Sequence, residues 1–423
     1  MKRILAVITI LVLVLTLASC GKTEEPASAT VTGTKDLGVK EIIVGLVAPQ
    51  TGASAFMGIA QAKGAQMAID EINAAGGVCG VPLRLVVRDD ESDPTKSLTY
   101  TQQVVLNEGA AFMIGQSNSA CALACVEFIT ENKILTLHPM ATSSSIVDPV
   151  KFPYSFRVHC SNDRQAKGMI NLAIEAGYKE AVILGDTSDL GVTGMASLKK
   201  YAEEYGLTIT DEITFVNGDA DLSPVATSIK NTGTKLVLSF AMGADSAKIL
   251  EALGRVDYLN KTAIIGYSGS ISTNVKALAG TLDLSNVYGV VHGDMCLAPN
   301  ADKLTAQSLY EKYNELYGHF TQDGSGRTFD TFGGLRTYEA IMIAAWAIEN
   351  TGSLNGDDLA KYIENHSSEY QPHIVPTPFT YSATDHEGWN PQNVYTVTMD
   401  SIINDGVNYF GDVYRGVSVA PVA

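Results

Sequence analysis

The sequence predicts an α/β fold with two doubly wound, parallel-sheet lobes. Short apolar runs of strand length alternate with longer stretches that have helical periodicity, and this alternation occurs twice along the chain. About 385 residues remain after an unusual N-terminal region, which is more than one hydrophobic core normally spans. Two lobes of similar construction follow from these observations.

In the first copy of the pattern, residues 42–48 have the composition of a buried strand. The stretch 58–75 carries small or apolar residues at the spacing of one helix face, and Gly76-Gly77 ends it. Asp93-Pro94 marks the start of the next helix. The expected strands are 42–48, 83–88, 111–114 and 134–137, and the expected helices are 58–75, 94–107 and 120–131.

A second copy follows the extended run 154–158. Its expected strands are 181–185, 208–215, 235–240, 262–266 and 287–291, and its expected helices are 163–176, 191–205, 223–231, 244–253 and 272–279. Three long helices then follow without the same alternation, at 301–317, 330–350 and 356–365. We infer that the chain returns to the first lobe there, crosses again near 379–381 and ends with a strand pair that includes 394–399.

The N-terminus has the features of a lipoprotein signal. Lys2 and Arg3 precede the apolar run 4–17, which is too short to span a membrane but has the length of a signal-peptide core. Leu17-Ala18-Ser19-Cys20 matches the bacterial lipobox, in which the cysteine is lipidated and becomes the new N-terminus. We therefore expect a signal peptide at 1–19, lipidated Cys20 and a polar linker to residue 40. The alternative is a signal peptide without lipidation.

Charge and cysteine content exclude several classes of protein. The formal net charge of −17, which becomes more negative when the leader is removed, argues against nucleic acid or anionic membrane as a partner. No other run is long and apolar enough to span a bilayer. An odd number of cysteines follows Cys20, with no zinc-like spacing, so neither a disulfide framework nor a metal site is expected. These cysteines are Cys79, Cys121, Cys125, Cys160 and Cys296.

No catalytic motif is present. The chain has no phosphate-binding loop and no dinucleotide fingerprint, and Gly266-Tyr-Ser-Gly-Ser270 differs from a nucleophile elbow at its last residue. His138 is a candidate general base, but a loop histidine bound to backbone is the better interpretation because no nucleophile can be placed beside it. The acidic run 89–93 lacks the pattern of a calcium loop and is interpreted as a solvated turn. We expect no catalytic residue, no metal and no cofactor.

Two loops stand out as a candidate anion site. Residues 114–119 and 138–143 each follow a short strand and are rich in hydroxyls and small residues that leave backbone N–H groups open. Loops at the carboxyl ends of parallel strands are where open α/β sheets bind ligands, and a helix beginning after Ser119 would add oriented amides. The alternative is that the Ser and Thr residues only cap helices.

Five segments together carry a family resemblance. They are IVGLVAPQTG at 43–52, AIDEINAAGGV at 68–78, DDESDP at 89–94, IG at 114–115 and PMAT at 139–142. This set resembles the leucine/isoleucine/valine-binding proteins, the type I periplasmic solute-binding components of branched-chain amino-acid ABC transporters. The resemblance covers roughly residues 41–400 and is denser in the first lobe.

The resemblance implies how the lobes are joined. Lobe 1 would comprise 41–158 and 292–378, and lobe 2 would comprise 159–291 and 379–423. Three crossing segments, near 157–163, 289–295 and 378–384, would form a hinge about which the lobes close on a solute. The family role further implies a monomeric protein, exported and lipid-anchored in the periplasm or on the outer face of the cell membrane, that delivers its solute to a membrane permease.

The resemblance also implies site residues. Ser119 and Thr142 correspond to the groups that hold the substrate carboxylate, and the carbonyl of Met140, next to Ala141, corresponds to the group that takes the ammonium. The family's acidic residue for the ammonium falls at Ser268, which has no charge. Its aromatic walls fall at Met57, Leu190 and Met242.

The missing acid leaves the solute open. Asp186, Asp189 or Asp245 would have to supply a substitute carboxylate for an amino acid to be held as in the family. Without such a carboxylate, the site should prefer a solute that has no α-ammonium. The family resemblance nevertheless implies an aliphatic amino acid of the branched-chain class, and we expect that ligand first. The alternative ligands are keto acids, aliphatic or aromatic carboxylates and amides. An exported α/β hydrolase is the alternative from another functional class, and turnover of model esters would identify it.

Overall fold

The computed structural model describes residues 35–423 apart from short stretches at 53, 242, 272, 295, 298–304, 318–328, 391–392, 399–401, 404–412 and 416–423. The expected signal peptide, Cys20 and most of the linker therefore lie outside the described residues. Residues Leu37–Ala423 form one compact unit. Within the part of the chain that is described, every helix is too short or too polar to span a bilayer.

Lobe 1 is built around a five-stranded parallel sheet in the order β2-β1-β3-β4-β5. Its strands are β1 (Ile42–Val47), β2 (Leu83–Arg88), β3 (Phe112–Ile114), β4 (Leu135–His138) and β5 (Ser155–Arg157). The strand and helix spacing expected for this region is confirmed to within a few residues. Strand β5 pairs with β4 and completes this first sheet.

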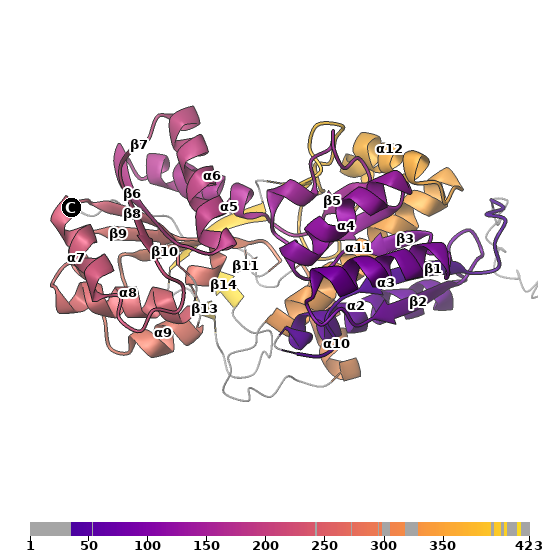
Figure 1. Cartoon of the computed structure of the whole chain (residues 1–423), viewed down its shortest axis with the longest axis horizontal. Helices are drawn as coiled ribbons and strands as arrows, with labels where there is room; N and C mark the ends of the chain where they lie inside the picture. Colours follow the sequence, from indigo (N-terminus) through magenta and orange to yellow (C-terminus); the bar gives the residue numbers. More distant parts are fainter. Residues whose placement is uncertain are drawn as a thin grey trace, which may run out of the picture. The chain divides into compact units, whose positions relative to one another are not determined.

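Helices cover both faces of this sheet (Figure 1). The helices of lobe 1 are α2 (Ala55–Ala74), α3 (Pro94–Leu106), α4 (Ser119–Glu131), α10 (Gln307–Tyr317), α11 (Phe329–Thr351) and α12 (Gly356–His366). Alternate strand residues point to opposite faces, so Val44 and Leu46 pack with α2, α11 and α12, whereas Ile43 and Val47 pack with α3. Strands buried on both sides explain the near-continuous apolar runs in the sequence.

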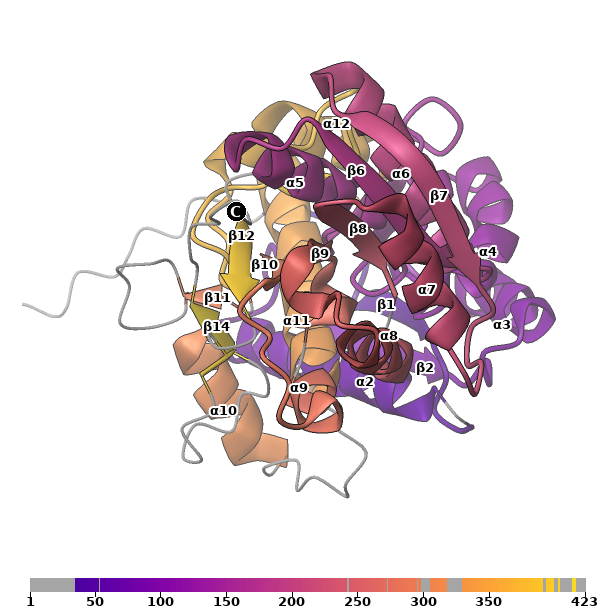
Figure 2. The same ribbon diagram turned by 90° about the vertical axis from the view of Figure 1, so that its left-hand side faces the viewer.

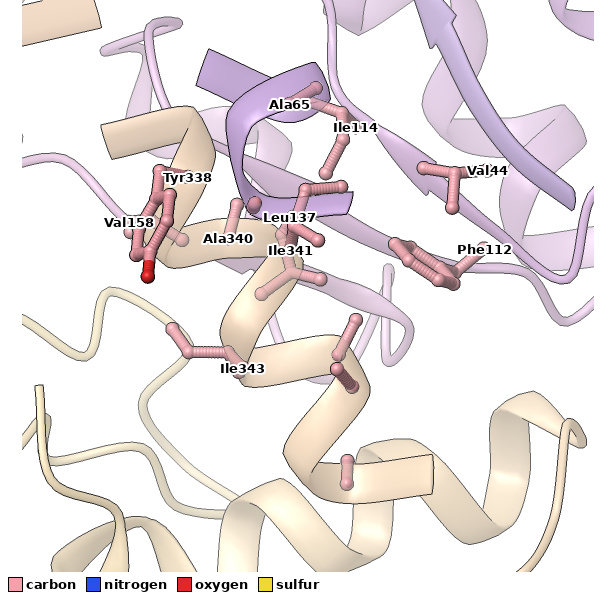
Figure 3. Close-up of a cluster of buried hydrophobic side chains, with 14 of the residues drawn as sticks. Val44, Ala65, Phe112, Ile114, Leu137, Val158, Tyr338, Ala340, Ile341 and Ile343 are labelled. Carbon is pink, nitrogen blue, oxygen red and sulfur yellow. The ribbon is translucent and has the colours of Figure 1, made fainter. Parts of the chain in front are cut away.

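Lobe 1 is completed by a helix from late in the chain. Ile341 and Ile343 of α11 are buried in one cluster with Ile114 and Leu137 of the sheet (Figure 3). Helix α11 also packs closely on α2, because a Cβ placed on Gly64 would lie 1.8 Å from the carbonyl oxygen of Gly334. Only glycine at position 64 permits this approach of two backbones.

Lobe 2 is built around a six-stranded sheet in the order β12-β10-β9-β8-β6-β7 (Figure 2). Its strands are β6 (Glu180–Asp186), β7 (Thr208–Phe215), β8 (Leu236–Phe240), β9 (Ala263–Gly266), β10 (Val287–His292) and β12 (Val394–Thr398). All neighbours are parallel except β12, which runs antiparallel to β10 at one edge. The expectation of two mainly parallel sheets is confirmed.

Helices cover both faces of the second sheet as well. They are α5 (Asn162–Glu175), α6 (Asp189–Tyr205), α7 (Ser223–Thr232), α8 (Gly243–Arg255) and α9 (Thr273–Ala279). Residues of α5 and α6 pack with Ala181 and Ile183 on one face, and residues of α7 and α8 pack with Val182 and Leu184 on the other. A small third sheet joins β11 (Cys296–Leu297), β14 (Val413–Arg415) and β13 (Ile402–Ile403).

The chain passes between the lobes at three places. The first passage follows β5, and the second follows β10, which pairs in the second sheet up to His292, so it begins within the expected 289–295. Phe379, Tyr381 and Trp389 are buried in the lobe 1 core. The third passage therefore lies between Trp389 and β12, later than the expected 378–384, because these aromatic side chains are needed to fill the core of lobe 1.

Candidate functional site

The first candidate loop follows β3 and is held from beneath by a buried glutamine. Gln61 of α2, which is 0% exposed, donates from Nε2 to the carbonyl oxygen of Gly115 at 3.1 Å. Its Oε1 accepts a short hydrogen bond from the hydroxyl of Ser117. Helix α4 then begins at Ser119. The Ser119 side chain therefore lies beside the backbone N–H groups of the first helical turn, which have no partner within the helix. The loop is fixed to the lobe before any ligand is bound.

The second loop follows β4 and contacts the first. The backbone N–H of Ser143 donates to Ser119 Oγ over 3.2 Å, so the predicted residues Ser119 and Thr142 are brought to neighbouring loops. Both side chains are half-buried. Because Ser119 Oγ accepts this bond, its own O–H can still be donated to a ligand oxygen.

A buried arginine orients the second loop. The guanidinium of Arg157, at the end of β5, donates short hydrogen bonds to the carbonyl oxygens of Ala141 and Ser143. No peptide bond in the described chain is cis, so the N–H of Thr142 points away from the carbonyl of Ala141 and hence away from Arg157. The amide of Thr142 is thereby turned to the side of the loop opposite Arg157.

The other predicted residues of lobe 1 contribute less through their side chains. Met140 is 7% exposed and its sulfur packs beside Gly333 of α11, and the Ala141 side chain is also buried. Only the backbone of these two residues is available to a ligand. Met57, in the first turn of α2, is half-buried and can form part of an apolar wall.

Lobe 2 places its predicted residues at the carboxyl ends of its strands. Leu190 lies in the first turn of α6 after β6, and Ser268 begins a short 3₁₀ turn (Ser268–Ser270) after β9. Both are half-buried. The N–H of Ser268 donates to Gln165 Oε1 at 2.9 Å, which fixes this turn to α5. Met242 lies outside the described residues.

Two of the three aspartates that could replace the missing acid are occupied. Asp186 is 1% exposed and accepts from the N–H and hydroxyl of Ser188 and, at 2.9 Å, from Asn217 Nδ2. Asp245 accepts from Gly218 N at 2.7 Å and from Lys248 Nζ at 3.0 Å. These carboxylates stabilise the turns of lobe 2. The side chain of Asp189 is not among those described.

His138 is a structural residue, but it lies in strand β4 and not in a loop, and its ring bonds to a side-chain hydroxyl and not to backbone as expected. Its Nε2 lies 2.7 Å from the hydroxyl of Ser155, and the side chain is fully buried. Burial, with a smaller effect of the Arg157 charge, lowers the pKa of His138 to about 3. The imidazole is therefore neutral at ordinary pH, and it lies inside the lobe instead of at a surface that a substrate could reach.

The acidic run 89–93 is also structural, and it is not wholly the solvated turn expected, because Asp90 is buried and accepts from Ser97 Oγ at 3.0 Å. Asp89 accepts from Gln50 N at 2.8 Å, and Asp93 caps helix α3 by accepting from Thr95 N at 2.7 Å. Within the residues that are described, no group of three or more His, Cys, Asp or Glu could hold a metal ion. The five cysteines after Cys20 are all buried, and none of them is in a disulfide in the described structure.

Sequence reasoning missed three polar residues of this region. Gln61 and Arg157 hold the two loops from inside the lobe, and the side-chain oxygen of Asn118, directly before Ser119, is buried without a hydrogen-bond partner among the described atoms. Buried polar atoms are normally paired, so this oxygen marks a place for a donor from water or from a ligand. The available signal for Arg157 was a charged residue inside the extended run 154–158.

The chain is similar to known proteins over most of its length. The family described as "Periplasmic binding protein" matches residues 41–406. The Leu/Ile/Val-binding protein homolog 1 of Brucella abortus (strain 2308) is 26% identical over 325 residues, which cover 76% of this chain and 81% of that protein.

Solved structures share the fold. The branched-chain amino acid transporter substrate-binding protein LivJ of Streptococcus pneumoniae, in complex with isoleucine, has a TM-score of 0.65 and 23% identity, covering 85% of this chain and 96% of that one. An ABC transporter solute-binding protein of Rhodopseudomonas palustris, in complex with 4-hydroxybenzoate, has a TM-score of 0.66 and 16% identity, covering 90% and 98%.

Proposed function

Because this chain belongs to the periplasmic binding protein family and is homologous to the Leu/Ile/Val-binding proteins, we propose that it captures a small carboxylate-bearing solute and delivers it to an ABC importer. The family consists of binding proteins and not enzymes, so the hydrolase alternative is set aside. What the family leaves open is the solute, the closing movement and the attachment to the membrane.

The observation that carries the proposal is the pair of loops that holds Ser119 and Thr142. The Ser119 hydroxyl accepts from Ser143 N and keeps its proton for a ligand, while the Thr142 amide is turned away from Arg157. Hydroxyl and amide donors converging at the carboxyl ends of parallel strands suit a carboxylate. We propose that this pair binds the carboxylate of the solute.

The opposing loops favour an apolar body without a second charge. Leu190 and Met57, and by family position Met242, would supply aliphatic walls, and Ser268 stands where the family has an acid. Asp186 and Asp245 are occupied by groups of lobe 2 itself. An ammonium buried without a carboxylate costs several kcal/mol, which is a large share of the roughly 8 kcal/mol behind a micromolar affinity. These contacts favour a solute without an α-ammonium, such as a 2-keto acid or an aromatic acid.

The two solved relatives illustrate the choice. One was solved with isoleucine, an amino acid, and the other with 4-hydroxybenzoate, a carboxylate that has no ammonium. Both molecules join a carboxylate to an apolar body. Our proposal for this chain keeps the carboxylate common to both and places the branched-chain amino acid second to the carboxylate without an ammonium.

Calorimetric titration tests the proposal directly. Leucine, its 2-keto counterpart 4-methyl-2-oxopentanoate, and 4-hydroxybenzoate are titrated in parallel, with the alcohol leucinol as a control that lacks the carboxylate. We expect a carboxylate to bind, leucinol not to bind, and leucine to bind more weakly than its keto counterpart. Tighter binding of leucine would instead identify a hidden acid, and Asp189 would be the first residue to mutate.

We also propose that the protein works outside the cytoplasm on a lipid anchor at Cys20. Several acyl chains on one cysteine would hold it at the membrane, since each buried methylene contributes about 0.8 kcal/mol. We expect wild-type protein in the membrane fraction and Cys20→Ala in the soluble fraction or uncleaved. Wild-type protein that is wholly soluble after detergent-free fractionation would contradict the anchor and leave the binding function unaffected.

A further inference from the structure

The positively charged side chain of Arg157 is buried inside the protein, where a charge loses its contact with water at a cost in free energy. This residue ends the edge strand β5, and its side chain is 0% exposed. Removing a guanidinium from water is favourable only when its donors are satisfied and its charge is paired. Glu387 pairs the charge, since Nε donates to Glu387 Oε2 at 2.8 Å and Nη2 donates to Glu387 Oε1 at 3.3 Å. Two further donors are used on the ligand loop.

The contacts on the ligand loop fix two successive parts of its backbone. Arg157 holds the carbonyls of Ala141 and Ser143, while the intervening N–H of Ser143 is held by Ser119 Oγ. The planar fork of a guanidinium can satisfy two carbonyls and a carboxylate at once, whereas an ammonium cannot reproduce that geometry. A positive charge on the carbonyl of a peptide also polarises it, which makes the N–H of Thr142 a stronger donor.

The same arginine connects this loop to the segment before the third passage. Its backbone N–H donates to His386 O at 2.9 Å, and its carbonyl accepts from the Tyr381 hydroxyl at 2.6 Å. The N–H of Glu387 donates to Asp385 Oδ1 at 2.9 Å. Asp385 in turn pairs with Arg164, on the first turn of α5 in lobe 2. Two ion pairs, Arg157–Glu387 and Arg164–Asp385, joined by one backbone hydrogen bond therefore lead from the ligand loop to the first helix of the other lobe.

We propose that Arg157 is the positioning residue of the ligand site: with Glu387 it sets the Thr142 amide for a carboxylate and links that amide, through Asp385 and Arg164, to helix α5. The carboxylate role of Thr142 rests on the proposed function, but the positioning of the loop does not. Loss of the fork leaves two carbonyls without their donor and lets the peptide between Ala141 and Thr142 rotate.

The first arm of the test needs no ligand. Amide hydrogen exchange is measured over residues 139–146 in the ligand-free, full-length protein carrying Arg157→Lys or Glu387→Gln, which keep a donor or an acceptor at each position. The control is Glu41→Gln, which breaks the exposed Arg84–Glu41 pair. We expect exchange in 139–146 to rise about tenfold in both site variants and in neither the control nor strand β6. Unchanged exchange in 139–146 would overturn the proposal.

The second arm separates positioning from mere stability. Each variant is titrated with 4-hydroxybenzoate and its uncharged analogue 4-hydroxybenzamide, or with the keto acid and its amide where that pair binds wild type. We expect affinity for the carboxylate to fall about tenfold and affinity for the amide to change less than twofold. Equal losses for both analogues would assign Arg157 a structural role only. Should none of these probes bind wild type, the ligand proposal fails, and the exchange measurement alone decides the positioning of the loop.

Discussion

The two lobes present opposite kinds of surface from the same kind of fold. In lobe 1 the loops after β3 and β4 keep donors available, because Gln61 and Arg157 hold them through their carbonyl and side-chain oxygens. In lobe 2 the polar side chains at the strand ends are turned back on their own lobe, as Asp186 and Asp245 show. Parallel sheets place loops at one edge in both cases, but the partners of those loops decide whether they bind a ligand or stabilise the lobe. The following predictions test that difference.

The largest expected effect is the loss of ligand affinity when a hydrogen-bond donor of lobe 1 is removed. A hydrogen bond to a charged group contributes roughly 1.5 to 3 kcal/mol, so Ser119→Ala or Thr142→Ala should weaken a carboxylate ligand about ten- to a hundredfold. Calorimetry with the best carboxylate gives the affinities, and thermal unfolding controls for stability. Weakening below twofold at both positions would place the carboxylate site elsewhere.

Closure of the two lobes on a ligand should bring the loops of lobe 1 and lobe 2 together. A ligand bound only by the closed form raises stability by about 2.7 kcal/mol at a hundredfold excess over Kd, which corresponds to several degrees in Tm for a protein of this size. The radius of gyration from solution scattering should shrink at the same ligand concentration. Tight binding without compaction would contradict the hinge.

Restoring the acid in lobe 2 should reverse the preference for the ligand. Ser268→Glu places a carboxylate at the family's position, so we expect leucine to gain about tenfold over its 2-keto counterpart. The matched control is Ser268→Gln, which has nearly the same volume and no charge. If the glutamate and glutamine variants bind leucine equally, charge at this position does not set the ligand class.

Asp186 should matter for stability and not for binding. Asp186→Asn replaces one acceptor oxygen by an NH2 donor that faces donor groups and leaves part of a buried network unpaired, at a cost of about 1 to 3 kcal/mol. Chemical denaturation measures this loss, and titration should give an unchanged affinity for the carboxylate. A selective loss of leucine binding would instead show that Asp186 reaches an ammonium.

As the pH falls, lobe 1 and the segments that connect the lobes should lose stability first. The middle of lobe 2 should lose stability later. Burial lowers the pKa of His138 and of His292 to about 3, while both imidazoles titrate near 6.5 in the unfolded chain. The unfolded state therefore takes up more protons below about pH 6.5, and stability present above that pH is lost as the pH falls toward 3. The sequence has no histidine between His159 and His292.

Hydrogen exchange between pH 7 and pH 4.5 measures this difference. Residues around β4 and β10 should lose protection before β6 and β8, and His138→Gln should make the dependence of Tm on pH less steep. Simultaneous loss of protection in all strands would show that the buried histidines do not set the order of acid unfolding.

Much of the fold could be predicted because its signals are local. The periodicity of the run 58–75 and the Asp93-Pro94 start signal gave α2 and α3 to within a few residues. The position of Ser119 followed from the rule that ligands bind at the carboxyl ends of parallel strands. The third passage was placed too early, because burial of Phe379 and Tyr381 depends on packing with α11 and α12, which no local pattern encodes.

The remaining features of the site depend on distant partners. Asp186 with Ser188 has the pattern of a local turn in which the side chain binds the backbone two residues on, a signal that was available in the sequence. The contact of Arg157 with Glu387 joins residues 230 positions apart, so the function of this buried charge could not be assigned without the structure.

The close contact of Gly64 with Gly334 has a consequence for how the chain acquires its structure. Helix α11 covers one face of the first sheet, yet it is encoded some way beyond all the parallel strands of the second. Lobe 2 is nearly continuous in sequence, whereas lobe 1 requires closure of a loop that contains most of lobe 2. Contacts between distant parts of a chain form slowly, because loop-closure entropy is lost before the contact is gained. We therefore expect lobe 2 to fold first. The ligand-binding loops, which belong to lobe 1, should become ordered last.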